Sequence, residues 1–214
     1  MNKNYLITLL VLFVVVLAFN IYRDNGVVEE QIITNADFRN GEFPLNDETW
    51  RRLTLDDLGN IQFNFRVDPN GYVLVERSLV PEDDIALEKI YVLMLKTDYE
   101  EFVQSIEPRE DPPAITVYIF KNIQNMFPWE WAQHHQLYSN IKSDPEISDV
   151  VVGGANTIRY KTNGLYQAEN VIVAHGGYIY LLSGAYLNED SLIRNDFKNL
   201  ISDLRFVAPR DTSL

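Results

Sequence analysis

The feature that constrains this chain most is an apolar run at its N-terminus. Tyr5 to Tyr22 are eighteen consecutive positions without a charged side chain, and only Thr8 and Asn20 are clearly polar. At about 1.5 Å per residue, such a helix measures about 27 Å, close to the roughly 30 Å hydrocarbon core of a bilayer. A helix with no polar face has nowhere to pack in so small a domain. We therefore predict a transmembrane anchor within residues 1–22, with residues 5–22 in the membrane.

The charges on either side of this run predict its orientation. The α-amino group and Lys3 precede it, whereas Arg23 is followed at once by Asp24. Because positive charge stays on the cytoplasmic side, we expect a single-pass cell-membrane protein with a cytoplasmic N-terminus and an extracytoplasmic C-terminal domain. The alternative is a secretory signal cleaved after Ala18, which would release a secreted domain. Both hypotheses place the domain outside the cytoplasm.

The composition indicates one ordinary folded domain. Of the 214 residues, 46% are hydrophobic and 23% are charged, which is enough apolar material for one core. The net charge of −13 repels phosphate backbones, so we predict no nucleic-acid partner. The chain has no cysteine, and its core must therefore be stable without disulfides.

Polarity divides the chain into four parts. Residues 23–46 are polar and irregular, with turn signals at Asn25-Gly26 and Asn40-Gly41, and we expect them to form a stalk. The folded domain is expected at residues 47–209, followed by a tail at 210–214.

Hydrophobic periodicity predicts a sheet. Ile61, Phe63 and Phe65 alternate with polar residues, as in a strand with one buried face. Gly176-Gly177 is interpreted as a tight hairpin turn and Gly153-Gly154 as a bulge. The expected strands are residues 61–67, 72–79, 85–95, 114–121, 156–161, 166–174 and 178–184.

Three amphipathic segments predict helices at residues 97–107, from Phe127-Pro128 to about 141, and at 191–204. The apolar stripe of the second helix is Phe127, Trp131, His134, Tyr138 and Ile141. In the third, Asp196 is expected on the side away from the sheet. We predict an α+β fold with a central, mostly antiparallel sheet flanked by helices, an α/β/α sandwich.

Both ends of this domain carry a family resemblance. The segment TWRRLTLDDLGNIQFNFRVDPNGY is similar to the start of PsbP-like domains. The segments VIVAHGGYIYLLSGAY and DSLIRNDFKNLISDLRF resemble that family's last hairpin and C-terminal helix. The resemblance covers roughly Trp50 to Phe206, although the helix and proline-rich linker from Thr97 to Pro113 depart from the pattern. It implies a sheet sandwiched by helices and an extrinsic subunit or assembly factor rather than an enzyme.

An aromatic cluster is the candidate binding site. Trp131 and Tyr138 share the helical stripe and are expected to pack in the core. Trp129 lies off the stripe, and an exposed tryptophan beside two histidines would suit a partner or ligand. The predicted contact residues are Trp129, His134, His135 and Tyr138.

The two histidines are expected to differ in burial. His134 shares the stripe and should be half-buried and hydrogen-bonded, whereas His135 should lie in solvent. Glu130 and His134 are four residues apart on one face and could offer two metal ligands, but a zinc site needs three or four. We therefore predict no metal site and no cofactor.

No complete catalytic motif is recognisable. Ser139 and Lys142 have the S-x-x-K spacing of serine acyl-enzymes, but no S-D-N follows. We therefore predict a non-enzymatic domain that binds a protein partner or assists assembly of an envelope complex. One alternative is a domain that binds a small ligand or calcium through its acidic loops, which are residues 56–57, 82–84, 100–101 and 107–111. Another is a hydrolase with an unrecognised site, for which Ser139, His134 and Glu130 are the candidates.

Overall fold

A computed structural model describes residues 30–32, 50–55, 58–79, 86–105, 110–142 and 146–207, with the backbone alone for residues 30–32. The predicted anchor at residues 1–22, most of the stalk and the tail at 210–214 lie outside these residues. Within the part that is described, no helix is both long and apolar enough to cross a membrane.

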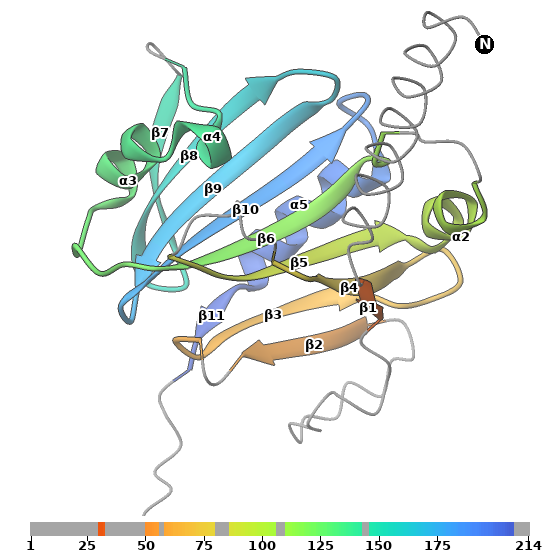
Figure 1. The fold of residues 1–214 in the computed structure, drawn as a ribbon, viewed down its shortest axis with the longest axis horizontal. Coiled ribbons are helices and arrows are strands. Elements are labelled where there is room, and N and C mark those ends of the chain that lie inside the picture. The colour runs from red at the N-terminus through yellow and green to blue at the C-terminus, as the bar shows by residue number, and fades with distance from the viewer. Residues whose placement is uncertain are drawn as a thin grey trace, which may run out of the picture.

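The centre of the domain is an eight-stranded antiparallel sheet in the order β1-β4-β5-β6-β10-β9-β8-β7 (Figure 1). The predicted α+β class with an antiparallel sheet is confirmed. In the stalk region, β1 pairs with β4. The strands are β1 (Glu30–Ile32), β4 (Tyr72–Arg77), β5 (Leu87–Leu95), β6 (Ala114–Lys121), β7 (Ile147–Val152), β8 (Ala155–Asn163), β9 (Gln167–His175) and β10 (Tyr178–Tyr186).

One face of this sheet is covered by helix α5 (Leu192–Asp203) together with a second, three-stranded sheet. The second sheet has the order β11-β3-β2, with β2 (Trp50–Leu55), β3 (Ile61–Arg66) and β11 (Arg205–Phe206). The predicted alternating strand β3 therefore buries its apolar face against the large sheet instead of extending it. Phe63 of β3, Leu182 of β10 and Phe197 of α5 are fully buried in this core.

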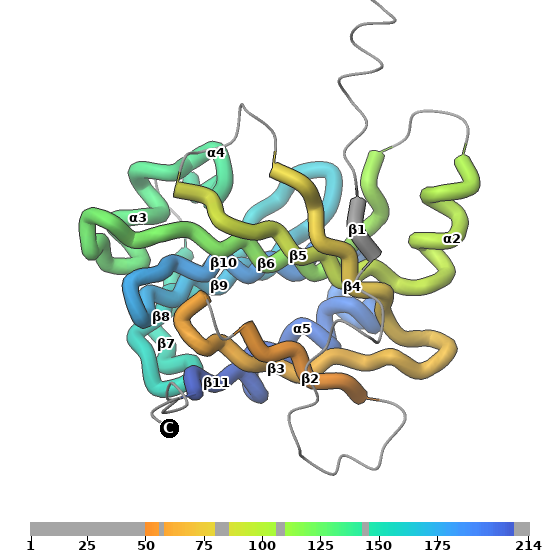
Figure 2. Tube along the Cα trace, turned by 60° about the horizontal axis from the view of Figure 1, so that its bottom comes forward, coloured from red at the N-terminus to blue at the C-terminus, as the bar shows by residue number. Residues whose placement is uncertain are grey.

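The opposite face carries α3 (Pro128–His134) and α4 (Gln136–Ser139) (Figure 2). Trp131 of α3, Phe120 of β6 and Ile172 of β9 belong to the buried cluster beneath them. Helix α2 (Lys96–Gln104) follows β5, and its Tyr99 and Phe102 pack against a smaller cluster on β4 and β5.

Two details of the sequence interpretation are wrong. Gly153-Gly154 is not a bulge but the two-residue turn between β7 and β8, with φ of 58° and 86°. Such a turn needs positive φ at both positions, which glycine adopts freely. Asp196 does not face solvent, because it is buried and accepts a hydrogen bond of 3.0 Å from the hydroxyl of Tyr72 in β4.

Candidate functional site

The predicted site residues lie on two short helices separated by a break. Phe127 is the extended residue before α3, and Pro128 occupies the first turn, where its missing N–H costs nothing. Helix α3 ends at His134, and His135 leaves helical geometry with φ −115° and ψ 51° before α4 begins. The helical stripe expected from the sequence is therefore interrupted at residue 135.

Because of this break, His135 rather than His134 packs against the domain. The His135 ring stacks on Trp131 with centroids 4.5 Å apart, and its Nδ1 lies 3.0 Å from the Trp131 carbonyl oxygen. His135 is half-buried, whereas His134 is exposed. The prediction of a half-buried His134 and a solvated His135 is wrong, because it assumed one continuous helix.

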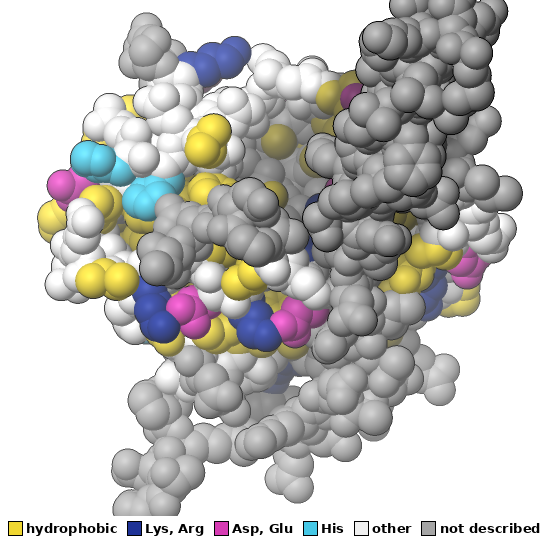
Figure 3. Space-filling view, viewed as in Figure 1, with side chains coloured by type: hydrophobic (Ala, Val, Ile, Leu, Met, Phe, Trp, Pro, Cys, Tyr) yellow, Lys and Arg dark blue, Asp and Glu magenta, His cyan; other side chains and the backbone are white. Residues whose placement is uncertain are grey.

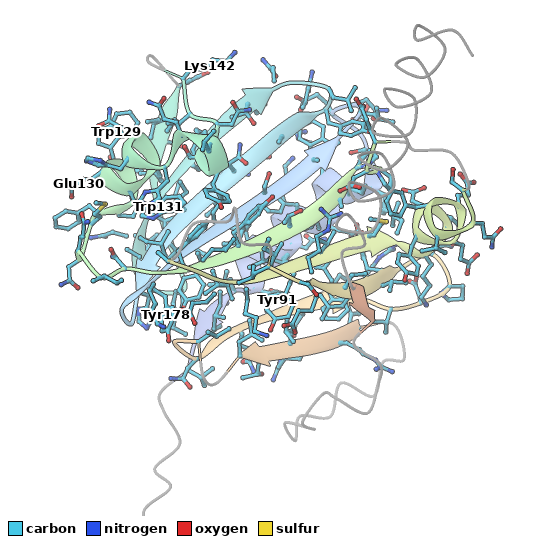
Figure 4. All side chains as sticks on the ribbon, viewed as in Figure 1. Tyr91, Trp129, Glu130, Trp131, Lys142 and Tyr178 are labelled. Atoms are coloured by element: carbon cyan, nitrogen blue, oxygen red, sulfur yellow. The ribbon has the colours of Figure 1, made fainter. Side chains whose placement is uncertain are left out.

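The two other predicted contact residues are partly packed. Trp129 was expected to be exposed but is half-buried and packs against the cluster around Trp131. Tyr138 lies edge-on to Phe120 at 4.9 Å between ring centroids. Figure 4 shows Trp131 between α3 and the sheet and Glu130 on the outer side of the helix. These aromatic rings therefore hold α3 and α4 on the sheet.

Ser139 is part of the packing as well. Its side chain is buried, and its hydroxyl donates a 2.7 Å hydrogen bond to the Ala132 carbonyl. Its own carbonyl accepts a 2.7 Å bond from the Tyr160 hydroxyl, and burial raises the pKa of that tyrosine. Lys142 is exposed and extends outward (Figure 4). This environment gives Ser139 a structural role and denies a substrate access to its hydroxyl.

A groove of about 350 Å³ lies beside the start of α3. One wall is the loop between β6 and α3, from which Asn122 and residues 125–128 line the groove. Ala155 and Asn156 of β8 and residues 174–177 of the β9–β10 hairpin complete the lining. Gly176 and Gly177 form that hairpin's two-residue turn, as predicted, with φ of 59° and 80°.

The surface around this groove is unusually apolar. Among the described residues, four large hydrophobic side chains are more than 70% exposed, and all four belong to the segment between β6 and β8. Ile123 and Phe127 come from the groove-forming loop, and Val151 of β7 pairs with the groove residue Asn156. We call Ile123, Phe127 and Val151 the apolar rim. The fourth, Leu137, lies on α4.

The groove itself carries little charge. His175 is the titratable side chain among its lining residues, and its ring stacks on Phe206 at 3.9 Å. Charges on the neighbouring strands compensate one another, as in the 2.7 Å ion pair between Lys121 and Glu88. Basic and acidic side chains alternate along the lower side of this face, and histidine side chains are visible in the region of α3 and α4 (Figure 3). The groove is therefore suited to an uncharged group, and its asparagine side chains offer hydrogen-bond partners beside the apolar ones.

The described residues do not gather three or more His, Cys, Asp or Glu side chains in a geometry that could hold a metal ion. Of the acidic loops considered for calcium, residues 56–57, 82–84 and 107–109 lie outside the described part of the chain.

The apolar rim was not predicted from the sequence, because helical spacing places Phe127 on the packed stripe. One signal was available: a residue directly before Pro128 precedes the first helical turn, and so it need not share the buried face. The exposure of Val151 had no such signal, because β7 itself was not predicted.

Comparison with known proteins finds a likeness among solved structures. No family model matches the sequence, and the search of curated proteins finds no match. Among solved structures, the chain is similar to the solution structure of cyanobacterial PsbP from Synechocystis sp. PCC 6803, with a TM-score of 0.48 and 10% sequence identity. The alignment covers 78% of this chain and 97% of that one. PsbP-like domains are also the family that the sequence resembles.

Proposed function

We propose that this chain is a non-enzymatic domain that binds a protein partner through the groove and its apolar rim. The observation that carries the proposal is the gathering of Ile123, Phe127 and Val151, each more than 70% exposed, around one neutral groove. Exposed apolar side chains that cluster at one end of an acidic protein are typical of an interaction surface. Binding would remove these side chains from water, which is favourable.

The chemistry of the groove supports a binding role. General acid–base catalysis needs a titratable group oriented by a second polar group. His175 is stacked on Phe206, and the other lining residues are neutral. Ser139, which has the nucleophile spacing, is occupied by the hydrogen bond that it donates to Ala132.

We further propose that residues 5–22 anchor the domain at the extracytoplasmic side of the membrane. The support is the sequence itself: an uncharged apolar run with Lys3 before it and acidic residues after it. Tethering raises the effective concentration of the domain for membrane-bound partners without any new contact. We expect the chain to stay with membranes in alkaline carbonate, and external protease to digest the domain in spheroplasts. Recovery of the intact chain from the cytosol would contradict this part.

A second candidate function rests on the size of the groove. Its volume of about 350 Å³ lies at the lower end of the range for small-molecule sites, roughly 300–1,000 Å³. A small uncharged ligand is therefore the alternative occupant. It would leave the chain monomeric, whereas a protein partner would not.

Native electrophoresis of membranes solubilised from the source cells tests the proposal. We expect the 24.8 kDa chain to migrate as part of a larger complex. The variant Phe127→Ser should return it to the mass of the free chain. Val103→Ser is the control, because Val103 is also an exposed apolar side chain but lies on α2. An unchanged complex in both variants would contradict the proposed surface.

A further inference from the structure

Strand β7 forms one edge of the large sheet, and its neighbour in the sheet is β8. Val152 and Ala155 flank the two-residue turn and therefore form a hydrogen-bonded pair. Because hydrogen-bonded and non-hydrogen-bonded pairs alternate in an antiparallel ladder, Ile147, Asp149 and Val151 direct their backbone N–H and C=O groups to the outer edge. These groups form a template on which another strand can pair.

The same three residues lie on the face of the sheet that carries α3. Ile147 pairs with Tyr160, which belongs to the core under α3 and α4, and Val151 pairs with Asn156, which lines the groove. A strand added at this edge would therefore place every second side chain beside the apolar rim and the groove.

Two of the devices that usually protect an edge strand are missing here, and Asp149 is the one charge within β7. Residues 147–152 contain neither lysine nor proline, and Val151 is 71% exposed. At the end of the strand, Gly153 forms a bridge with Arg205 of β11. Among the residues that the structure describes, no strand pairs with the outer side of β7. A protein that exposes such an edge is suited to recognition by strand addition.

The charges at the outer edge of β7 indicate which kind of partner can pair with it. Glu146 and Asp149 are both exposed, and neither forms an ion pair with a described residue. A second copy of this chain would bring the same two carboxylates and a net charge of −13 to the contact. Like charges opposite each other destabilise a strand pair, whereas opposite charges stabilise it.

We propose that β7 binds an extended segment of a partner protein as an added antiparallel strand. The segment carries an apolar residue opposite Val151 and a lysine or arginine two residues later, opposite Asp149. This inference rests on the proposed function, because it specifies how the partner is bound. Main-chain hydrogen bonds supply the pairing, and the apolar and basic side chains supply the specificity.

Hydrogen exchange on the full chain in detergent tests this proposal. The probe is a capped peptide of the sequence Thr-Val-Thr-Lys-Thr-Val-Thr at millimolar concentration. We expect it to slow exchange of the Ile147, Asp149 and Val151 amides at least severalfold. A peptide with glutamate in place of lysine should bind several times more weakly. Unchanged exchange at the three amides would overturn strand addition.

Two substitutions at one position separate the backbone from the charge. Asp149→Ala removes the carboxylate and keeps the outward N–H, whereas Asp149→Pro removes both and leaves the bonds to β8 in place. We expect the proline variant to bind the peptide at least about tenfold more weakly than the alanine variant. Equal binding by the two variants would overturn the proposal, provided that thermal unfolding shows both are folded.

The outcome also distinguishes this inference from the proposed function. If Phe127→Ser dissociates the native complex while Asp149→Pro leaves it intact, the partner binds the apolar rim without adding a strand. The strand-addition proposal is then wrong, and the proposed function stands. If the isolated full chain is a dimer that Asp149→Pro dissociates, the edge belongs to a second copy and the inference is wrong.

Discussion

The imidazole ring of His135 lies parallel to the indole of Trp131, with 8° between the ring planes and 4.5 Å between the centroids. Trp131 in turn packs at 4.8 Å on Phe120 of the central strand β6. The stack therefore connects the break between α3 and α4 to the middle of the sheet. It fixes the loop that presents Phe127, because that loop joins β6 to α3.

Replacing His135 should destabilise the domain, whereas replacing its neighbour should not. Aromatic pairs contribute about 0.5–1.5 kcal/mol beyond their buried area, so we expect His135→Ala to lower the free energy of unfolding by about 1 kcal/mol or more. Exposed His134→Ala should stay within about 0.5 kcal/mol of the parent. Urea unfolding of the two variants measures both values. A larger effect at His134 would mean that the continuous-helix interpretation was correct.

Ser139 should behave as a structural residue. Ser139→Ala removes the donor to the buried Ala132 carbonyl and should cost about 1–3 kcal/mol of stability. Lys142→Ala should cost less than about 0.5 kcal/mol, because Lys142 is exposed. If instead both variants lost a hydrolytic activity without losing stability, the two residues would form a catalytic pair.

The buried Asp196 carboxylate should make stability depend on pH. Burial raises the pKa of Asp196 above its ordinary value, and the hydrogen bond from Tyr72 and the charge of Arg66 oppose this shift. The native state then binds more protons than the unfolded state at pH values between the unfolded and native pKa, so this contribution to stability falls as pH rises through that window. The Asp196→Asn variant has no titrating carboxyl group at this position and therefore lacks this pH dependence.

The measurement is the difference in unfolding free energy between the parent and Asp196→Asn, taken at several pH values from about 4 to 7. We expect the difference, parent minus variant, to decrease as pH rises. A difference that grows with pH would mean that the carboxylate is stabilised in its charged form, and the assigned burial effect would be wrong.

Buried tyrosines should set the alkaline limit of the fold. Burial raises the pKa of Tyr91 to about 12, and it also raises the pKa of Tyr72, Tyr160 and Tyr180. Because the native pKa lies above the unfolded value of about 10, the stability from Tyr91 is complete below pH 10 and is lost between about 10 and 12. Tyr91→Phe should therefore show a shallower loss of stability in this range. An identical slope would contradict the burial effect.

Local patterns predicted most of the elements, because each of them depends on its own residues. The alternation in β3 and the apolar runs of β5, β6, β9 and β10 are strong signals, and the amphipathic stripe of α5 faces the sheet as expected. Asp196 lies on the predicted polar side of α5 but is buried, where it accepts a hydrogen bond from Tyr72. Tyr72 is 124 positions away in the sequence. Periodicity carries no information about such a distant pair.

The candidate site was predicted less well than the fold. The predicted region is the right one, because the exposed apolar side chains lie on and around α3 and α4. Of the four predicted contact residues, however, Trp129, His135 and Tyr138 are partly packed. Strand β7 was missed because Ser148 and Asp149 interrupt its apolar pattern, as is common in an edge strand. The groove is lined by one loop and two hairpins that are distant in the sequence. The strand order of the sheet places them side by side, and local patterns do not predict that order.

Photo-crosslinking from single cysteines tests the partner-binding account most directly. The chain has no cysteine of its own, so Phe127→Cys and Val103→Cys each give one labelling site for a photoactivatable maleimide. Irradiation of labelled full chain reconstituted into membranes of the source cells should give one discrete protein adduct from position 127, with little from position 103. Adducts of equal yield and pattern from both positions, or none from position 127, would contradict a partner surface at the groove.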